Sequence, residues 1–215
     1  MELYADPITV NCRKVLAGLQ LMGVDYKLVK VDYFQGEQKN APYLAINPNA
    51  SLPAMRDDGM TLWESNSILQ YAADKHGKTA FYPTDLKTRA DINRWLFWES
   101  AQWFPSCYVF LVDNCVKPLL GGAPDPAVLE KETPNFHKLA GILDQRLSHS
   151  SWICGSGPTI ADIAVASAMH LHHWQKLPLG NHKHVTRWMT ENVEHLPAWK
   201  NTSVYEGFSL TKMAA

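Results

Sequence analysis

Asn49-Ala50-Ser51-Leu52-Pro53-Ala54-Met55 is the stretch that decides the fold of this chain. Pro53 has no backbone N–H and holds Leu52 in an extended conformation, so Leu52 can stand at the entry to a strand with its own N–H and C=O facing outward. Those free groups can pair with an extended peptide. The Leu52–Pro53 bond is also a candidate for a cis peptide. The stretch therefore predicts a strand that begins beside a peptide-binding edge.

A helix N-terminus is predicted shortly afterwards, at Glu64-Ser65-Asn66-Ser67-Ile68, across the turn Asp58-Gly59. The hydroxyl of Ser65 comes just before a periodic apolar run that starts at Ile68. Unsatisfied N–H groups and the positive dipole at such a helix end favour a carboxylate. A short peptide with a free carboxylate would fit both stretches at once, and glutathione is such a peptide.

Two domains are predicted from the distribution of strand and helix signals. Up to about residue 76 these signals alternate: Leu3-Tyr4 begins a strand, residues 12–22 form a helix, and residues 26–31 form a second strand. Asp58-Gly59 between two apolar segments predicts a hairpin. This order, with a proline entering the third strand, is that of an α/β thioredoxin-like N-terminal domain, which we assign to residues 1–78.

An all-α helical C-terminal domain is predicted for residues 86–215, because no convincing strand signal follows residue 86. A long helix rich in Trp and Phe begins at Asp85, and Pro105 should kink or interrupt it. Further along, Thr159 and Asp162 have the spacing of a capping box. The apolar segment after them predicts a buried helix.

The composition excludes several functional classes. The 215 residues carry a formal net charge of -1 with acidic and basic residues interspersed, which excludes the basic footprint of a nucleic-acid-binding protein. No uncharged apolar run is long enough to cross a membrane, and the N-terminus lacks a signal-peptide pattern, so we expect a soluble, cytoplasmic protein. The four cysteines lack the CxxC spacing of zinc sites and are expected to stay reduced; they are Cys12, Cys107, Cys115 and Cys154.

No metal site is expected at the histidine-rich segment His170-Leu171-His172-His173-Trp174. Adjacent histidines on a helix point in different directions, and no carboxylate has the spacing to complete a site with them. We therefore interpret these histidines, with His182 and His184 after them, as solvated or core-edge residues.

Four elements in this order carry a family resemblance: Leu52-Pro53, Glu64-Ser65, the linker near residues 77–83, and Pro158-Thr159-Ile160-Ala161-Asp162-Ile163-Ala164. With these elements the chain resembles the cytosolic glutathione transferases over nearly its whole length. The resemblance implies a glutathione-binding first domain, a helical domain that supplies most of the pocket for a hydrophobic small-molecule electrophile, and a homodimer. It implies no metal and no bound cofactor, with glutathione as the co-substrate.

The resemblance also assigns binding residues by position. Leu52 would contact the peptide through its backbone. The loops around Leu52 would hold the γ-glutamyl end and the glycine carboxylate of glutathione and complete the peptide edge. The implied glutathione contacts are Gln38 and Lys39 for the glycine carboxylate, Ser51, Leu52 and Pro53 for the peptide edge, and Glu64 and Ser65 for the γ-glutamyl end. Those implied for the electrophile pocket are Trp103, Phe104, Ser106 and Tyr108.

The residue that activates the thiol is expected in the turn Asp6-Pro7-Ile8-Thr9-Val10-Asn11-Cys12-Arg13-Lys14. Alignment with the plant-type phi class puts Thr9 where that class has its serine, which keeps a hydroxyl there. In the bacterial nu class a Thr and an Asn two residues later occupy this turn, as Thr9 and Asn11 do here. We therefore predict a bacterial enzyme with a phi- or nu-like turn and with Thr9 and Asn11 as its catalytic residues.

The physical task of Thr9 is modest. A cysteine-like thiol has a pKa of about 8.5, and lowering it by about two units requires roughly 2.7 kcal/mol. A charge-assisted hydrogen bond supplies roughly 1.5–3 kcal/mol, and a helix N-terminus adds about 0.3–1 kcal/mol. The alternative for Thr9 and for Asn11 is a plain helix cap. Cys12 is the rival, because a thiol beside Arg13 and Lys14 would have a depressed pKa and could form a mixed disulfide with glutathione.

The leading prediction is a glutathione transferase in which Thr9 stabilises the glutathione thiolate for attack on an electrophilic carbon. Two alternatives stay open. One is a glutathione-dependent disulfide reductase or peroxidase, which the pair Thr9 and Asn11 makes plausible. The other is a non-catalytic protein that binds glutathione or carries a ligand.

Overall fold

Strand β1 (Glu2–Ala5) lies inside a four-stranded sheet with the order β2-β1-β3-β4. The computed structural model describes residues 1–204. β1 pairs in parallel with β2 (Lys27–Lys30) and antiparallel with β3 (Ala54–Asp57), and β3 pairs antiparallel with β4 (Met60–Trp63). This mixed sheet confirms the thioredoxin-like prediction.

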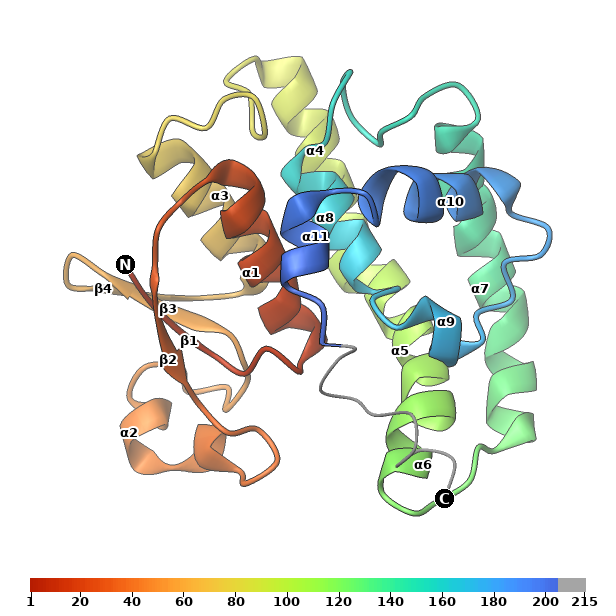
Figure 1. The fold of residues 1–215 in the computed structure, drawn as a ribbon, viewed down its shortest axis with the longest axis horizontal. Coiled ribbons are helices and arrows are strands. Elements are labelled where there is room, and N and C mark those ends of the chain that lie inside the picture. Colours follow the sequence, from red (N-terminus) through yellow and green to blue (C-terminus); the bar gives the residue numbers. More distant parts are fainter. Residues whose placement is uncertain (205–215) are drawn as a thin grey trace.

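Helices α1 (Val10–Met22) and α3 (Ser65–Lys75) lie side by side, between the sheet and the helical part of the chain (Figure 1). α1 ends at Gly23, whose left-handed φ of 60° closes the helix. Gly18 lets the two helices approach closely, because a side chain there would collide with Leu69 of α3. The middle of α1 therefore packs closely against α3.

The Leu52–Pro53 peptide bond, which the sequence marks as a candidate for a cis peptide, is cis, and it leads into β3. The turn between β3 and β4 is formed by Asp58 and Gly59, which both have positive φ, as a type I′ hairpin requires. A helical turn, η1 (Glu37–Lys39), and a short helix, α2 (Ala41–Leu44), connect β2 to this edge of the sheet.

The second domain begins with a continuous helical rod in which α-helical and π-helical segments alternate. Pro105 and Pro118 each stand in the first turn after a π-helical segment. A proline lacks the N–H that donates the i to i−4 hydrogen bond, so the backbone hydrogen-bond pattern changes near Pro105 and Pro118. Pro105 thus interrupts the α-helical pattern without ending the rod. The segments are α4 (Leu86–Trp98), η2 (Glu99–Trp103), α5 (Phe104–Leu111), η3 (Val112–Val116) and α6 (Lys117–Leu119).

Helix α8 (Ile160–Ser167) is buried at every position, as its apolar sequence predicts. The capping box between Thr159 and Asp162 is present. Asp162 accepts the Thr159 N–H at 2.9 Å and the Thr159 hydroxyl at 3.0 Å, and it also accepts the Ile153 N–H at 2.8 Å and the Trp188 indole N–H at 3.1 Å. The carboxylate therefore joins the loop before α8 to the C-terminal helices.

The remaining helices complete the second domain. The prediction extends this domain to residue 215, but residues 205–215 lie outside the described part of the chain. The predicted first domain ends at residue 78, after α3, and the predicted second domain begins at residue 86, the first residue of α4. No helix within residues 1–204 has both the length and the apolar character that crossing a bilayer requires. These helices are α7 (Pro126–Leu147), α9 (His172–Gln175), α10 (Lys183–Arg187), η4 (Trp188–Val193) and α11 (Pro197–Asn201).

Arg13 of α1 fastens the two domains together. Its buried guanidinium donates to the backbone oxygen of His170 at 2.8 Å and to that of Trp199 at 3.3 Å. It also lies over the Trp199 ring, 4.2 Å from the centroid. The start of α1 is therefore fixed from the side of the second domain.

Candidate active site

Two adjoining cavities open at the N-terminus of α1, where the predicted catalytic turn lies. The first, about 350 Å³, is lined mainly by polar side chains of α1, α3 and α4. The second, about 360 Å³, is lined mainly by apolar side chains of the catalytic turn, the loop after β2 and the helical rod. Asn11 and Phe104 line both, so the cavities meet at these residues. We call them the polar cavity and the apolar cavity.

The polar cavity is built around a buried ion pair. Lys14 Nζ lies 2.8 Å from Glu99 Oε2 and donates to the Ser65 hydroxyl at 3.1 Å. Asn66 Nδ2 donates to the same Glu99 oxygen at 3.1 Å. Lys14 and Glu99 are 1% and 0% exposed, so little water screens the pair. Both predicted γ-glutamyl residues, Glu64 and Ser65, line this cavity.

Glu64 occupies the N-cap position of α3, yet its side chain does not cap the helix. Its φ of 72° is uncommon for a residue with a side chain. The carboxylate is exposed at the cavity, and the first N–H groups of α3 receive no hydrogen bond from it. The Glu64 side chain therefore does not serve as a helix cap and is available to a ligand.

Thr9 occupies the N-cap position of α1 and lines the apolar cavity. Its hydroxyl does not cap the helix but donates to the backbone oxygen of Asp6 at 3.2 Å. The first N–H groups of α1 thus stay available to an anion. Because a hydroxyl group rotates freely, the same proton can turn from the Asp6 carbonyl to a bound thiolate.

Asn11 lies in the first turn of α1 and lines both cavities. Within residues 1–204 no hydrogen bond engages its side-chain amide. The amide has two N–H donors. It is therefore placed to donate to a ligand atom at the junction of the two cavities, and the helix-cap alternative for Asn11 has no hydrogen bond to support it.

The alternative in which Cys12, the rival of Thr9, is the reactive thiol does not fit the structure. Its side chain is 0% exposed, and burial raises its pKa to about 12. Arg13 and Lys14 do not lower this pKa, because their charges are directed into the second domain and towards Glu99. The other three cysteines are also free and buried, in line with a packing role.

Asp6 fixes the geometry of the catalytic turn, although the sequence did not single it out. Its buried carboxylate accepts the Ile8 N–H at 3.3 Å and the Tyr33 N–H at 3.0 Å. Tyr33 and Phe34 line the apolar cavity. Asp6 therefore holds the loop after β2 against the catalytic turn. Tyr33 and Phe34 form an aromatic pair in a polar loop, and this sequence signal could have identified this part of the site.

The predicted peptide-binding edge borders the apolar cavity. Ser51 and Leu52 line the cavity, whereas Pro53 is buried behind them. The hydroxyl of Tyr43 and the amide of Asn47 donate to the Ser51 backbone oxygen at 2.6 and 2.8 Å. These two bonds hold the loop that carries the edge.

Gln38 and Lys39 line neither of the two cavities. Gln38 is 4% exposed, and its side-chain oxygen has no hydrogen-bond partner within residues 1–204. Lys39 is exposed on η1. Their assignment to the glycine carboxylate stays a prediction.

Phe104 and Tyr108, two of the predicted electrophile contacts, line the apolar cavity one helical turn apart on α5. Their ring centroids are 5.3 Å apart. Burial, with a smaller effect of Tyr33, raises the pKa of Tyr108. The phenol therefore remains a proton donor at neutral pH. An apolar wall with one phenol donor suits an aromatic or hydrophobic electrophile.

The prediction that Trp103 and Ser106 also contact the electrophile is wrong. Trp103 is 0% exposed, stacks on Trp98 and donates its indole N–H to the Val165 oxygen at 3.1 Å. Ser106 is 2% exposed, and its hydroxyl donates to Glu132. Neighbouring residues on an α-helix are separated by about 100° around the axis, so these two face the core when Phe104 faces the cavity.

The apolar cavity contains further side chains that the sequence analysis missed. Several lie on the rod at helical spacing after Phe104 and Tyr108, so periodicity counted from Phe104 would have found them. The residues missed are Leu111, Cys115, Val116 and Leu119 on the rod, and Ile8, Val10, Ala50, His170 and Leu171 elsewhere.

His170, at the edge of this cavity, predicts a pH dependence of stability. Burial, with a smaller effect of the Arg13 guanidinium, lowers the pKa of His170 to about 3. In the unfolded chain its pKa is about 6.5, so between these values the unfolded state binds a proton that the folded state does not. The stability contributed by neutral His170 is complete above about pH 6.5 and is lost as the pH falls. We expect a loss of about 2 kcal/mol between pH 7 and pH 5, measured by urea unfolding.

The variant His170→Gln identifies the source of this slope. Glutamine does not titrate, so the fall in unfolding free energy from pH 7 to pH 5 should become shallower by about the same amount. If wild type and variant lose stability in parallel, other groups cause the slope and the interpretation of His170 is wrong.

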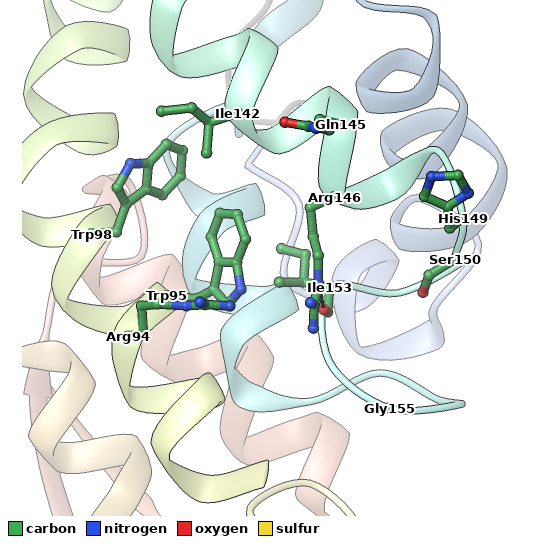
Figure 2. Close-up of a pocket in the computed structure, with 10 residues that line it drawn as sticks. All are labelled: Arg94, Trp95, Trp98, Ile142, Gln145, Arg146, His149, Ser150, Ile153 and Gly155. Carbon is green, nitrogen blue, oxygen red and sulfur yellow. Dashed lines mark hydrogen bonds between the residues drawn. The ribbon is translucent and has the colours of Figure 1, made fainter. Parts of the chain in front are cut away.

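A third cavity, about 640 Å³, lies between α4 and α7 and shares no lining residue with the other two (Figure 2). Trp95 and Trp98 of α4 line it together with Ile142 of α7. Arg94 and Arg146, which also line it, are both paired with Asp91. None of the predicted catalytic or binding residues lies here, so this cavity is separate from the candidate active site.

Comparison with known protein families gives two matches. The family of glutathione S-transferase N-terminal domains matches residues 10–75, and the family of glutathione S-transferase C-terminal domains matches residues 110–202. The first match contains the catalytic turn from Val10 onwards and the peptide-binding edge. The second contains most of the helical wall of the apolar cavity.

Individual relatives agree with these matches. A probable glutathione S-transferase, GSTF2 of Oryza sativa subsp. japonica, is 30% identical over 194 residues, which cover 89% of this chain and 90% of the relative. Glutathione S-transferase D7 of Drosophila melanogaster is 26% identical and covers 93% and 87%. Among solved structures, glutathione transferase F7 from Populus trichocarpa superposes with a TM-score of 0.84 at 28% identity and covers 97% of this chain and 99% of that one.

Proposed function

The chain belongs to the glutathione S-transferase family, and we propose that it activates the thiol of glutathione at Thr9 for attack on a hydrophobic electrophile. The observation that carries this proposal is the junction of the polar and apolar cavities at the N-terminus of α1. Glutathione extends from the peptide-binding edge to the γ-glutamyl residues. Its thiol then lies between Thr9 and Asn11, facing the apolar cavity.

Binding uses groups that the fold holds ready. Leu52 offers its backbone to the extended peptide, and Ser65 is fixed by its hydrogen bond from Lys14. Glu64 presents an exposed carboxylate to the γ-glutamyl ammonium. Because hydrogen bonds hold the Ser51 backbone and the Ser65 hydroxyl in place before the ligand arrives, little ordering is needed on binding.

Thiol activation requires preferential stabilisation of the anion. The Thr9 hydroxyl donates to the thiolate in place of the Asp6 oxygen, and the N–H groups at the start of α1 add their dipole. Asn11 orients the sulfur through its amide. A hydrogen bond to a charged group supplies roughly 1.5–3 kcal/mol, which matches the roughly 2.7 kcal/mol needed for a shift of two pKa units.

The transfer step forms a bond between the thiolate sulfur and the electrophilic carbon. In a substitution, the leaving group departs with the electron pair of its bond. In an addition, the carbon next to the attacked atom takes up a proton from solvent or from the Tyr108 phenol. The thiol proton has left before this step, so no oxidant or reductant is consumed and no bound cofactor is needed.

Glutathione-dependent reduction of a disulfide or a peroxide remains the alternative reaction. The unengaged amide of Asn11 beside Thr9 favours it, since a thiolate held by two donors can attack sulfur as well as carbon. This reaction would proceed without Cys12, which is buried. A protein that only binds glutathione or carries a ligand would instead leave the thiol pKa unchanged.

We also propose a homodimer and a cytoplasmic location. Met60 and Trp63 on β4 and Phe97 on α4 are exposed apolar side chains, with Phe97 at 72%, and a second copy of the chain would cover them. Four free cysteines fit a reducing compartment. The relatives reported above come from plants and an insect, so a bacterial source stays a prediction.

Titration of the bound thiol tests the proposed function. The absorbance of the thiolate, followed against pH in the complex, should give a pKa at least about one unit below that of free glutathione. Thr9→Ala should restore the free value, and Thr9→Ser should keep the lowered one because it retains the hydroxyl. If wild type leaves the thiol unshifted, the protein is a binding protein. If Thr9→Ala titrates like wild type, Asn11 or the helix end activates the thiol.

A further inference from the structure

Three side chains outside the active site converge on one point between α9 and the end of η4. His172 and His173 are consecutive residues of α9, and Glu194 follows η4. His173 Nε2 lies 3.1 Å from Glu194 Oε1, and His172 Nε2 lies 3.7 Å from the same oxygen. One ligand atom of each side chain lies within 4.8 Å of the other two.

The hydrogen bond of His172 Nδ1 determines which ring nitrogen has a lone pair for an ion. His172 Nδ1 lies 3.2 Å from the backbone oxygen of Met169, so Nδ1 carries a proton and donates it. In the neutral ring, Nε2 then has a lone pair that faces the Glu194 carboxylate. This nitrogen is buried and has no hydrogen-bond partner within residues 1–204, and the His172 side chain is only 8% exposed. A buried lone pair opposite a carboxylate oxygen is satisfied by a cation placed between them.

The geometry fits a transition-metal ion. A tetrahedral zinc ion has bonds of about 2.0–2.2 Å to nitrogen and oxygen, which places two of its ligands about 3.3 Å apart. The observed separations of 3.1 and 3.7 Å lie on either side of that value. The hydrogen bond from His172 Nδ1 to a backbone carbonyl is the support that metal-binding histidines commonly have.

We propose that His172, His173 and Glu194 form a binding site for a divalent transition-metal ion such as Zn²⁺, with the fourth position open to water. On binding, the neutral ring of His173 carries its proton on Nδ1 instead of Nε2, and the ion takes the place of the Nε2 proton beside Glu194. This site replaces the sequence-based expectation that no carboxylate is placed to join these histidines. Glu194 is 21 residues beyond His173 in the sequence, and the fold brings the two side chains together.

The ion would join a segment that borders the apolar cavity to the turn between η4 and α11. Leu171, which precedes His172, lines this cavity. Glu194 belongs to the turn that leads into α11, and α11 contacts α1. Metal binding would therefore stabilise the C-terminal part of the fold beside the electrophile, without contact with the glutathione thiol.

Titration of tag-free, chelator-treated protein with Zn²⁺ tests the proposal. Calorimetry should show one tight site per chain. At a free Zn²⁺ concentration a hundredfold above the dissociation constant, the melting temperature should rise by about 5–10 °C. His173→Ala and Glu194→Gln should each weaken binding at least about tenfold. Glu194→Gln keeps the shape of the side chain, so it remains informative if the alanine variant folds poorly.

His195→Ala is the matched control, because it removes an exposed histidine next to Glu194 that is not part of the site. This variant should bind Zn²⁺ as wild type does. Absence of tight binding in wild type would overturn the proposal. So would equal affinity in wild type, His173→Ala and Glu194→Gln, and so would a loss confined to His137→Ala, which would place the ion at the hydrogen-bonded pair of His137 and His182.

Discussion

Glu99→Ala is expected to lower the free energy of unfolding by about 3–5 kcal/mol, because it leaves the buried Lys14 ammonium without its counter-ion. Lys14 and Glu99 are 1% and 0% exposed, so water cannot take the place of the carboxylate. Asn66 also loses its carboxylate acceptor. Urea unfolding at neutral pH measures the loss. Glutathione affinity should fall as well, since Lys14 also donates to Ser65 in the polar cavity.

Two variants decide whether the buried charge is the cause. Lys27→Ala removes an ion pair with Glu2 in which the lysine side chain is 74% exposed, and it should leave stability nearly unchanged. The double variant Lys14→Met, Glu99→Gln removes both charges and should recover at least half of the loss. If Glu99→Ala is as mild as Lys27→Ala, the ammonium is solvated in the variant and the buried charge does not determine the stability.

Asp162→Ala is expected to cost at least about 3 kcal/mol, because it leaves three buried N–H groups without an acceptor. These are the backbone N–H groups of Ile153 and Thr159 and the indole N–H of Trp188. Burial raises the pKa of Asp162 to about 6 against the effect of these donors, so unfolding is best compared at pH 7.5, where the carboxylate is ionised. Asp162→Asn keeps an acceptor oxygen and should lose less.

Asp125→Ala provides the comparison for this variant. Asp125 is the exposed N-cap of α7 and accepts one backbone N–H, that of Ala127, at 3.0 Å. Its removal should cost about 1 kcal/mol, as is usual for an N-cap. Equal losses in the two variants would mean that Asp162 acts as an ordinary cap, and that its bonds to Ile153 and Trp188 do not add to stability.

Local signals in the sequence were sufficient to predict much of the fold and part of the candidate active site. Leu52–Pro53, the Asp58-Gly59 turn and the Thr159–Asp162 capping box each act over a few residues, and each has the predicted structure. Their physical causes are the missing N–H of proline, positive φ, and side-chain capping. The same short-range rules predict the helix N-terminus at Glu64 and Ser65, which line the polar cavity.

The remaining errors come from interactions that are distant in sequence. Cys12 was a reasonable nucleophile until the cations beside it were seen to bind the second domain and Glu99 instead. Glu194 meets His173 across 21 residues, a distance at which no spacing rule applies. Trp103 was assigned to the pocket together with Phe104 but lies in the core, because no periodicity predicts where a helix changes to π-helical hydrogen bonding.

The length of the helical rod sets which side chains reach the electrophile. A π-helical segment holds more residues per turn than the α-helix on either side of it. In the π-helical segment from Glu99 to Trp103 the wider turn absorbs one extra residue, so the side chains after it keep the direction that a regular α-helix would give them. Deleting one residue from this segment would let it return to α-helical hydrogen bonding, and Phe104 and Tyr108 would still face the cavity. A deletion within the regular α-helix on either side would instead turn every later side chain by about 100° around the axis. The π-helical segment is therefore the place where the rod can change its length by one residue and keep its pocket wall.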